Sequence, residues 1–176
     1  MLSLKYFRPG WIASILFAWC VAVQAADAPA KFKVGEFLFA RPDKWEWVEV
    51  TSSMRKAQLK VTDEKTKSSA EVVFFAGSMG GVQANVDRWF SQFQEARDKK
   101  TEEVAVGKHK VTYVTTQGTY LSGMPGGART PMKDHALLGA IITSPQGDVF
   151  IRMTGPAELV KSSTGSFKKM VEEALK

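Results

Sequence analysis

The sequence has 176 residues, with 24 lysines and arginines, 18 aspartates and glutamates, and a formal net charge of +6. This length is typical of one domain whose core is large enough to fold without disulfides or metals, and the scattered basic residues do not indicate nucleic-acid binding. The single cysteine, Cys20, lies in an N-terminal stretch that we expect to be removed, which excludes disulfides, thiolate catalysis and cysteine-ligated metals from the mature protein.

The N-terminal region has the pattern of a secretory signal peptide. Lys5 and Arg8 precede an apolar run at 11–23, which ends in small residues that fit a cleavage site. The run is shorter than the roughly 20 residues that span a bilayer, so we expect a protein exported to the periplasm or the extracellular space and not membrane-spanning after cleavage. The predicted organisation is a signal peptide at 1–25, a flexible leader at 26–30 and a single α+β domain at 31–176.

The first half of the domain is predicted to be rich in strands. Apolar and β-branched residues favour strands in five segments, at 31–34, 36–39, 45–50, 56–61 and 70–75. The last two are joined by a charged, turn-rich link, which predicts a hairpin. Because residues 72–75 are apolar at successive positions, we expect this strand to be covered on both faces.

A helix is predicted over residues 82–93. Its apolar residues fall on one stripe at three-and-four spacing, namely Val82, Val86, Trp89, Phe90 and Phe93. Asn85, Arg88 and Gln92 line one flank of that stripe, and we hypothesise that this polar flank contacts a ligand or partner. The basic run 97–100 is interpreted as the solvated C-terminal end of the helix.

The second half is predicted to return to strands and to close with helices. Strands are indicated at 103–106 and at 108–116, with the end of the latter left open between residues 116 and 120, followed by a long loop at 121–134 that is rich in glycine and proline. A terminal hairpin is predicted from 136–143 and 148–153. One short helix is expected at 157–161, and a second is expected to start at Ser163 or Thr164, with its buried stripe formed by Phe167, Met170, Val171, Ala174 and Leu175.

These elements predict an α+β fold. Most consecutive strands are joined by connections too short for a parallel crossover, so they must pair antiparallel. The expected architecture is a mostly antiparallel sheet of about seven or eight strands, covered by the inserted helix and the C-terminal helix.

Two further features carry a resemblance to known proteins. The aromatic first strands with Pro42-Asp-Lys-Trp45, together with the closing hairpin and helix, resemble the PsbP-like α/β/α sandwich of exported proteins. The stretches 82–90 and 118–127 look like those of an uncharacterised family of signal-peptide-bearing bacterial proteins. The resemblance implies no catalytic residues, and it loosely suggests an extrinsic subunit of an envelope assembly.

One stretch suggests catalysis. Residues 76–80 read Ala-Gly-Ser-Met-Gly, a variant of the nucleophile elbow between a strand and a helix, so Ser78 with His135 or His109, oriented by Asp134, defines a small serine hydrolase as an alternative. A glycine-rich turn into a helix explains the same residues. No histidine spacing typical of a metal site occurs, and neither a metal nor a cofactor is predicted.

The leading hypothesis is an exported, non-catalytic binding domain that uses the 121–135 loop and the adjoining sheet edge. Its partner would be another envelope protein or a small ligand, with no nucleic acid involved. A mobile hairpin connection accounts for the loop equally well, and that choice stays open at this point. The candidate binding residues are Tyr120, Ser122, Met124, Arg129, His135, Asn85, Arg88 and Gln92.

Overall fold

The computed structural model describes residues 28–78, 80–123 and 127–176. Within these ranges the chain forms nine strands and two helices. In chain order they are β1 (Lys31–Val34), β2 (Phe37–Ala40), β3 (Glu46–Trp47), β4 (Ala57–Thr62), β5 (Ser69–Ala76), α1 (Gly81–Phe90), β6 (Phe93–Val106), β7 (His109–Ser122), β8 (Thr130–Thr143), β9 (Val149–Pro156) and α2 (Ala157–Glu173).

Seven of the strands form one antiparallel sheet in the order β3-β4-β5-β9-β8-β7-β6, and β1 and β2 form a separate hairpin. The predicted α+β fold is therefore confirmed. Residues 137–142 of β8 and 149–151 of β9 are buried at every position, because these central strands contact a packed layer on each face. In β5 the same holds only for residues 72–74, and Glu71 on its front face is half-buried.

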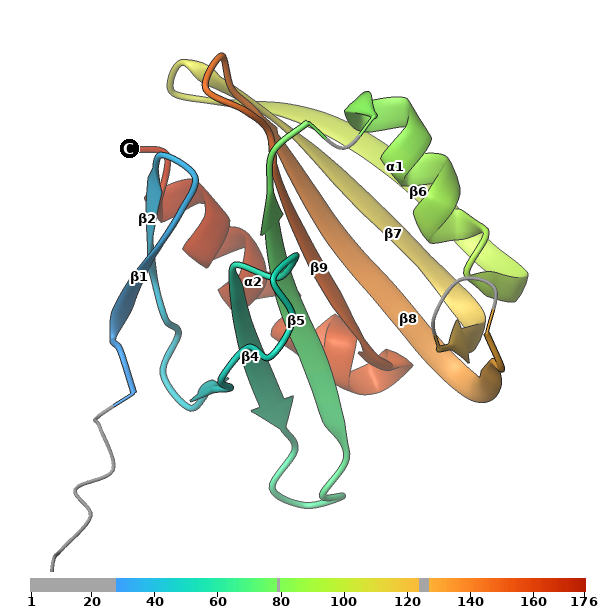
Figure 1. Ribbon diagram of the computed structural model, residues 1–176. Helices are drawn as coiled ribbons and strands as arrows, with labels where there is room; N and C mark the ends of the chain where they lie inside the picture. The colour runs from blue at the N-terminus through green and yellow to red at the C-terminus, as the bar shows by residue number, and fades with distance from the viewer. Residues whose placement is uncertain (1–27, 79, 124–126) are drawn as a thin grey trace, which may run out of the picture.

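The two helices lie on opposite faces of the sheet, with α1 in front and α2 behind in Figure 1. On the α2 side, the β1–β2 hairpin joins the helix in covering the sheet, and Phe39, Phe74 and Phe167 are fully buried there. On the α1 side, Val86 and Trp89 pack with a smaller cluster that includes Phe150. Neither helix in the described part of the chain is long and apolar enough to cross a membrane.

The inserted helix is shorter than predicted. It ends at Phe90, and β6 begins at Phe93, so the basic run 97–100 lies in a strand and not at a helix end. β6 is an outer strand of the sheet and most of its residues are exposed. Charged side chains and two register shifts protect such an edge from pairing with another chain. That protection removes the hydrophobic alternation by which a strand is recognised in sequence.

The prediction of a long loop at 121–134 is wrong for most of that segment, which is strand instead. β7 continues to Ser122 and β8 begins at Thr130, and the two pair through Tyr120 with Met132 and Leu121 with Pro131. β9 pairs with β8 only from His135 onward, so here β8 has one neighbour. A proline is tolerated in such a strand because only one edge of it needs backbone hydrogen bonds. Of the connecting residues 123–129, residues 124–126 lie outside the described ranges.

The C-terminal region contains one helix and not two. α2 runs without a break through the segment where Ser163 or Thr164 was expected to begin a second helix. The Thr164 hydroxyl donates to the Val160 carbonyl, 3.1 Å away, so it bonds to the preceding turn and does not cap a new helix. Pro156 ends β9 and precedes the helix. The strand predicted at 45–50 is reduced to β3, Glu46–Trp47.

Candidate functional site

One part of the sheet's front face is not covered by a helix. α1 lies over β6, β7 and β8, whereas the front of β4 and β5 is open to the viewer in Figure 1. In β4 the buried residues alternate with Gln58, Lys60 and Thr62, which are half-buried and face the open side. Such alternation is normal for an antiparallel sheet with one solvated face. A binding site on this face therefore has to be identified from features beyond polarity.

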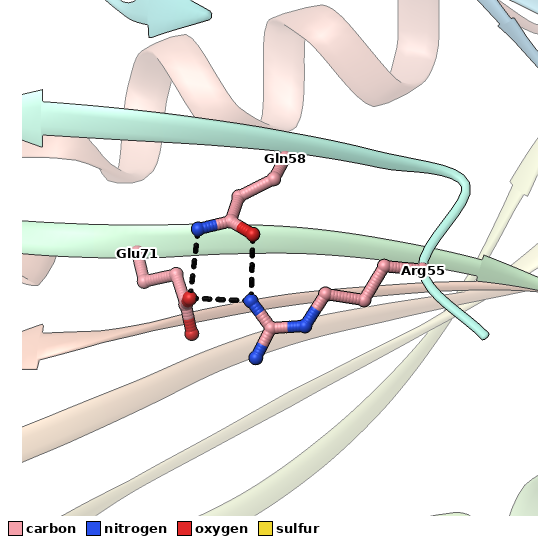
Figure 2. Close-up of polar contacts among 3 residues, drawn as sticks. All are labelled: Arg55, Gln58 and Glu71. Carbon is pink, nitrogen blue, oxygen red and sulfur yellow. Dashed lines mark hydrogen bonds and ion pairs between the residues drawn. The ribbon is translucent and has the colours of Figure 1, made fainter. Parts of the chain in front are cut away.

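The first such feature is a fixed carboxylate. Figure 2 shows Arg55, Gln58 and Glu71 joined in a triangle of hydrogen bonds. Arg55 Nη1 donates to Glu71 Oε1 and to Gln58 Oε1, both at 2.6 Å, and Gln58 Nε2 donates to Glu71 Oε1 at 2.9 Å. The pair is partly exposed, so it stabilises the fold by only about 0–1 kcal/mol. Its main effect is to hold the Glu71 side chain in one orientation.

Next to this carboxylate is a pocket of about 200 Å³ on the open face. It lies where the tip of the β7–β8 hairpin meets β5 and the end of β9. The lining residues are Ser69, Glu71, Tyr120, Ser122, Met132, His135, Thr154 and Gly155. The sheet register explains the assembly, because Tyr120 pairs with Met132 across β7 and β8, and Glu71 pairs with Thr154 across β5 and β9. Residues distant in sequence thus share one face of neighbouring strands.

Two aromatic rings form the wall of the pocket on the hairpin side. The rings of Tyr120 and His135 are stacked with centroids 6.5 Å apart, and the Tyr120 ring also contacts that of Phe93 at 5.2 Å. His135 Nδ1 lies 2.8 Å from the carbonyl oxygen of Lys133. A carbonyl only accepts, so Nδ1 carries the hydrogen in this bond and Nε2 of the neutral ring is an acceptor. The wall is therefore held in place by contacts within the protein.

A buried hydroxyl lies at the floor of the pocket. Thr154 is 8% exposed, and its Oγ1 has no hydrogen-bond partner among the described residues. Arg152 lies two residues earlier on the same face of β9; its Nη1 donates to Gln92 Oε1 at 2.8 Å, whereas its buried Nε has no partner within the described ranges. Buried polar groups are nearly always paired. Two such groups side by side are typical of a place where water or a ligand completes the bonding.

The structure brings together three of the predicted binding residues and separates the others. Tyr120, Ser122 and His135 line the pocket, and Gln92 lies beside it through its bond to Arg152. Arg129 is exposed on the hairpin connection. Met124 lies outside the described residues.

The remaining two predicted residues lie on α1. Asn85 is 1% exposed; its Nδ2 donates to the Gly81 carbonyl at 2.6 Å, and its Oδ1 accepts from Arg88 Nη1 at 3.1 Å. Asn85 is therefore part of the helix packing and is not presented on a surface flank, which corrects that interpretation. Arg88 is exposed on the helix.

Sequence reasoning missed the residues that β5 and β9 contribute, Ser69, Glu71 and Thr154. One signal was available: Glu71 is a charged residue inside an otherwise apolar run, Ala70-Glu-Val-Val-Phe-Phe75. A charge within a central strand must face solvent or a site. Glu71 meets Thr154 because β5 pairs with β9, and about 80 residues of chain separate the two strands. Local sequence patterns do not reveal such long-range strand pairing.

The serine hydrolase alternative is contradicted by the register of the sheet. Ser78 follows Ala76, which pairs with Val149 at the start of β9, whereas His135 pairs with Pro156 at its end. Seven residues of extended strand separate these positions, or about 23 Å. Asp134 lies beside His135, at the same distant end. The other candidate partner, His109, packs edge-on against Phe37 of β2 with ring centroids 5.0 Å apart.

A second concavity lies on the opposite face, between α2 and β7, with a volume of about 390 Å³. Several of its polar side chains bond within the protein. Gln117 donates to Asp98, and the Thr116 hydroxyl donates to the Arg97 carbonyl at 3.0 Å. Although this groove is larger, none of its described lining residues has a buried side-chain polar atom without a partner, which distinguishes it from the pocket on the open face. We therefore assign the candidate site to the pocket.

The described ranges contain no group of three or more His, Cys, Asp or Glu side chains placed to hold a metal ion. Comparisons with known proteins show no matching family model and no matching curated protein. Among solved structures, the chain is similar to the solution structure of cyanobacterial PsbP (CyanoP) from Synechocystis sp. PCC 6803. The TM-score is 0.51 at 9% sequence identity, over 80% of this chain and 88% of that chain. The chain therefore has a PsbP-like fold, as its sequence predicts.

Proposed function

We propose that this chain is an exported, non-catalytic binding domain, and that it binds another envelope protein through the pocket on the open sheet face. The observation that carries the proposal is the pocket itself, in which the Tyr120–His135 wall meets a buried Thr154 hydroxyl that has no partner among the described residues. The export half of the proposal rests on the signal-peptide pattern of residues 1–25.

A protein partner fits the pocket better than a free small molecule. The volume of about 200 Å³ is below the roughly 300–1,000 Å³ of typical small-molecule sites, but it suits one inserted side chain. The pocket also opens onto a broad polar face with the exposed Met132 at its edge. A central pocket for one anchoring side chain within a wider polar surface is the usual arrangement of protein interfaces.

The PsbP-like fold is compatible with this proposal, but the similarity concerns the fold alone and names no partner for this chain. A second form of the proposal is that the chain is an extrinsic subunit of an envelope assembly. Both forms use the same face, and they differ in whether the contact is permanent. Size-exclusion chromatography of native extracts separates them, because a subunit elutes with its assembly and a transient binder elutes near the mass of the free chain.

The proposal is tested by placing a photo-crosslinking amino acid at Met132 in cells that export the protein. Met132 is 40% exposed at the pocket, and Leu38, which is 56% exposed on β2, serves as the matched control. We expect one discrete adduct from position 132 and none from position 38, with the adduct lost when Tyr120→Ala is added. Equal adducts at both positions, or none at 132, would contradict the proposal.

A further inference from the structure

The chemistry of the pocket restricts what it can accept. Among the described residues that line it, Glu71 is the only one that carries a formal charge with His135 neutral, and none of them is a lysine or arginine. The other polar groups are hydroxyls and the imidazole. Resting on the proposed function, we infer that the pocket receives the cationic side chain of a lysine or arginine from the partner protein.

Three hydrogen-bond acceptors of the pocket are not used by the described residues. Within the described residues, both hydrogen bonds to the Glu71 carboxylate end on Oε1, which leaves Oε2 for a donor from the ligand. His135 Nε2 is the acceptor nitrogen of its ring because Nδ1 is bonded to the Lys133 carbonyl. The Thr154 hydroxyl at the floor has lone pairs without a donor. An ammonium or guanidinium group carries only donors and is complementary to this set.

The apolar parts of the pocket suit the stem of the same side chain. Tyr120 and Met132 are cross-strand neighbours on β7 and β8, and both line the pocket. An aromatic face attracts a cation, and a flexible thioether packs against methylene groups. A lysine or arginine side chain combines a long hydrocarbon stem with a charged end, so both halves find a matching surface.

Neighbouring charges determine how strong the attraction is. Arg55 pairs with Glu71 at 2.6 Å, and Lys60 pairs with Glu46 at 3.5 Å, while Arg152 beside Thr154 adds a guanidinium that bonds to the neutral Gln92. The surroundings of the pocket therefore carry no net negative charge. Binding therefore depends on short-range hydrogen bonds and ring contacts more than on long-range attraction. For an isolated side chain we expect a dissociation constant in the range of about 1–10 mM, which the rest of a protein interface would strengthen.

The inference is tested by NMR on the purified protein with labelled methionine methyl groups. Nα-acetyl-lysine methylamide is the probe, and the norleucine analogue, which lacks the ammonium group, is its control. We expect the Met132 methyl resonance to shift saturably with the lysine probe and much less with the norleucine probe. Met54, which is 70% exposed in a loop outside the pocket, should not respond to either.

Two variants locate the charge that matters. Glu71→Gln keeps an acceptor for Arg55 and Gln58 but removes the negative charge, and we expect it to weaken binding of the lysine probe about tenfold. Glu103→Gln is the matched control, because Glu103 is also paired with a cation, Lys110 at 3.0 Å, but lies on β6. It should bind the probe with wild-type affinity.

The inference is overturned if the norleucine probe binds as well as the lysine probe, if Glu71→Gln has no effect, or if Met132 does not respond at about 50 mM probe, well above the expected dissociation constant. After any of these results, the crosslinking experiment at Met132 still tests the proposed function separately. A discrete adduct at position 132 would then indicate a partner that inserts an uncharged group. Loss of both the adduct and the probe response would remove the function as well.

Discussion

The ring of Trp89 in α1 lies directly on Gly139 of β8. A Cβ atom added at Gly139 would come within 2.2 Å of Cζ3 of the indole and within 2.7 Å of Cε3. The contact fixes how closely α1 approaches the sheet, and it helps to place the helix over β7 and β8 so that the front of β4 and β5 stays open. The position of the pocket at the edge of the covered area thus depends on a glycine in the middle of a strand.

Gly139→Ala should therefore destabilise the protein by about 1–3 kcal/mol, because the indole must move to admit the methyl group. Urea unfolding measures the change. Gly165→Ala is the control, since a Cβ at this exposed position in α2 meets no atom within 4 Å, and it should stabilise the helix by up to about 1 kcal/mol. Equal effects of the two substitutions would contradict the proposed role of the Trp89 contact.

Thr154→Val should raise stability and weaken binding at the same time. The substitution replaces a buried hydroxyl without a partner by a methyl group of similar size, which is expected to stabilise the fold by about 1 kcal/mol. Thr112→Val is the matched control, because the Thr112 hydroxyl is also buried without a partner in the described part of the chain but does not line the pocket. Thermal unfolding should show a gain for both variants. Only Thr154→Val should reduce the yield of the Met132 crosslink.

Asn85→Ala should lower stability by about 1–2 kcal/mol without affecting binding. The buried amide donates to the Gly81 carbonyl and accepts from Arg88, so the substitution removes two hydrogen bonds and leaves unfilled space at a buried position. Gln83→Ala is the control, because Gln83 bonds to Asp87 at 2.9 Å on the exposed side of α1 and should contribute little. If Asn85→Ala abolished the Met132 crosslink while leaving the unfolding free energy unchanged, Asn85 would belong to the binding surface after all.

The turn between β4 and β5 should make a pH-dependent contribution to stability. Hydrogen bonds from the Thr66 and Lys65 backbone N–H groups to Asp63 Oδ1, both 2.8 Å, hold the pKa of Asp63 below its ordinary value of 3.8. A depressed pKa in the folded state means that the carboxylate stabilises the fold above the unfolded-state pKa, and that this stabilisation is lost as the pH falls through the folded-state pKa.

The Asp63→Ala variant should therefore unfold at a lower temperature than wild type at neutral pH, and the difference should shrink toward about pH 2. Asp63→Asn keeps an acceptor without the charge, so its unfolding temperature should show less of this pH dependence. A difference between wild type and Asp63→Ala that stays constant over the whole pH range would contradict the role given to the carboxylate.

The parts of the fold that sequence reasoning predicted are those whose pattern reflects burial. The stripe of Phe167 and Met170 and the apolar run of β5 both lie against a core. The spacing of their apolar residues therefore matches the faces that are buried. β6 and the outer ends of β7 and β8 lie at edges where side chains meet water, and their sequences resemble a helix end and a loop. The pocket was found only in part, because Tyr120 and His135 are near in sequence whereas Glu71 joins them through long-range strand pairing.

The most direct test of the central claim is hydroxyl-radical footprinting of the chain, alone and in the complex purified from the envelope. Met132 at the pocket and Met54 outside it are both exposed and are both readily oxidised. If the pocket is the binding site, oxidation of Met132 and Tyr120 should fall several-fold in the complex while that of Met54 is unchanged. Unchanged oxidation of Met132 together with protection of residues along α2 would place the interface on the opposite face and contradict the account.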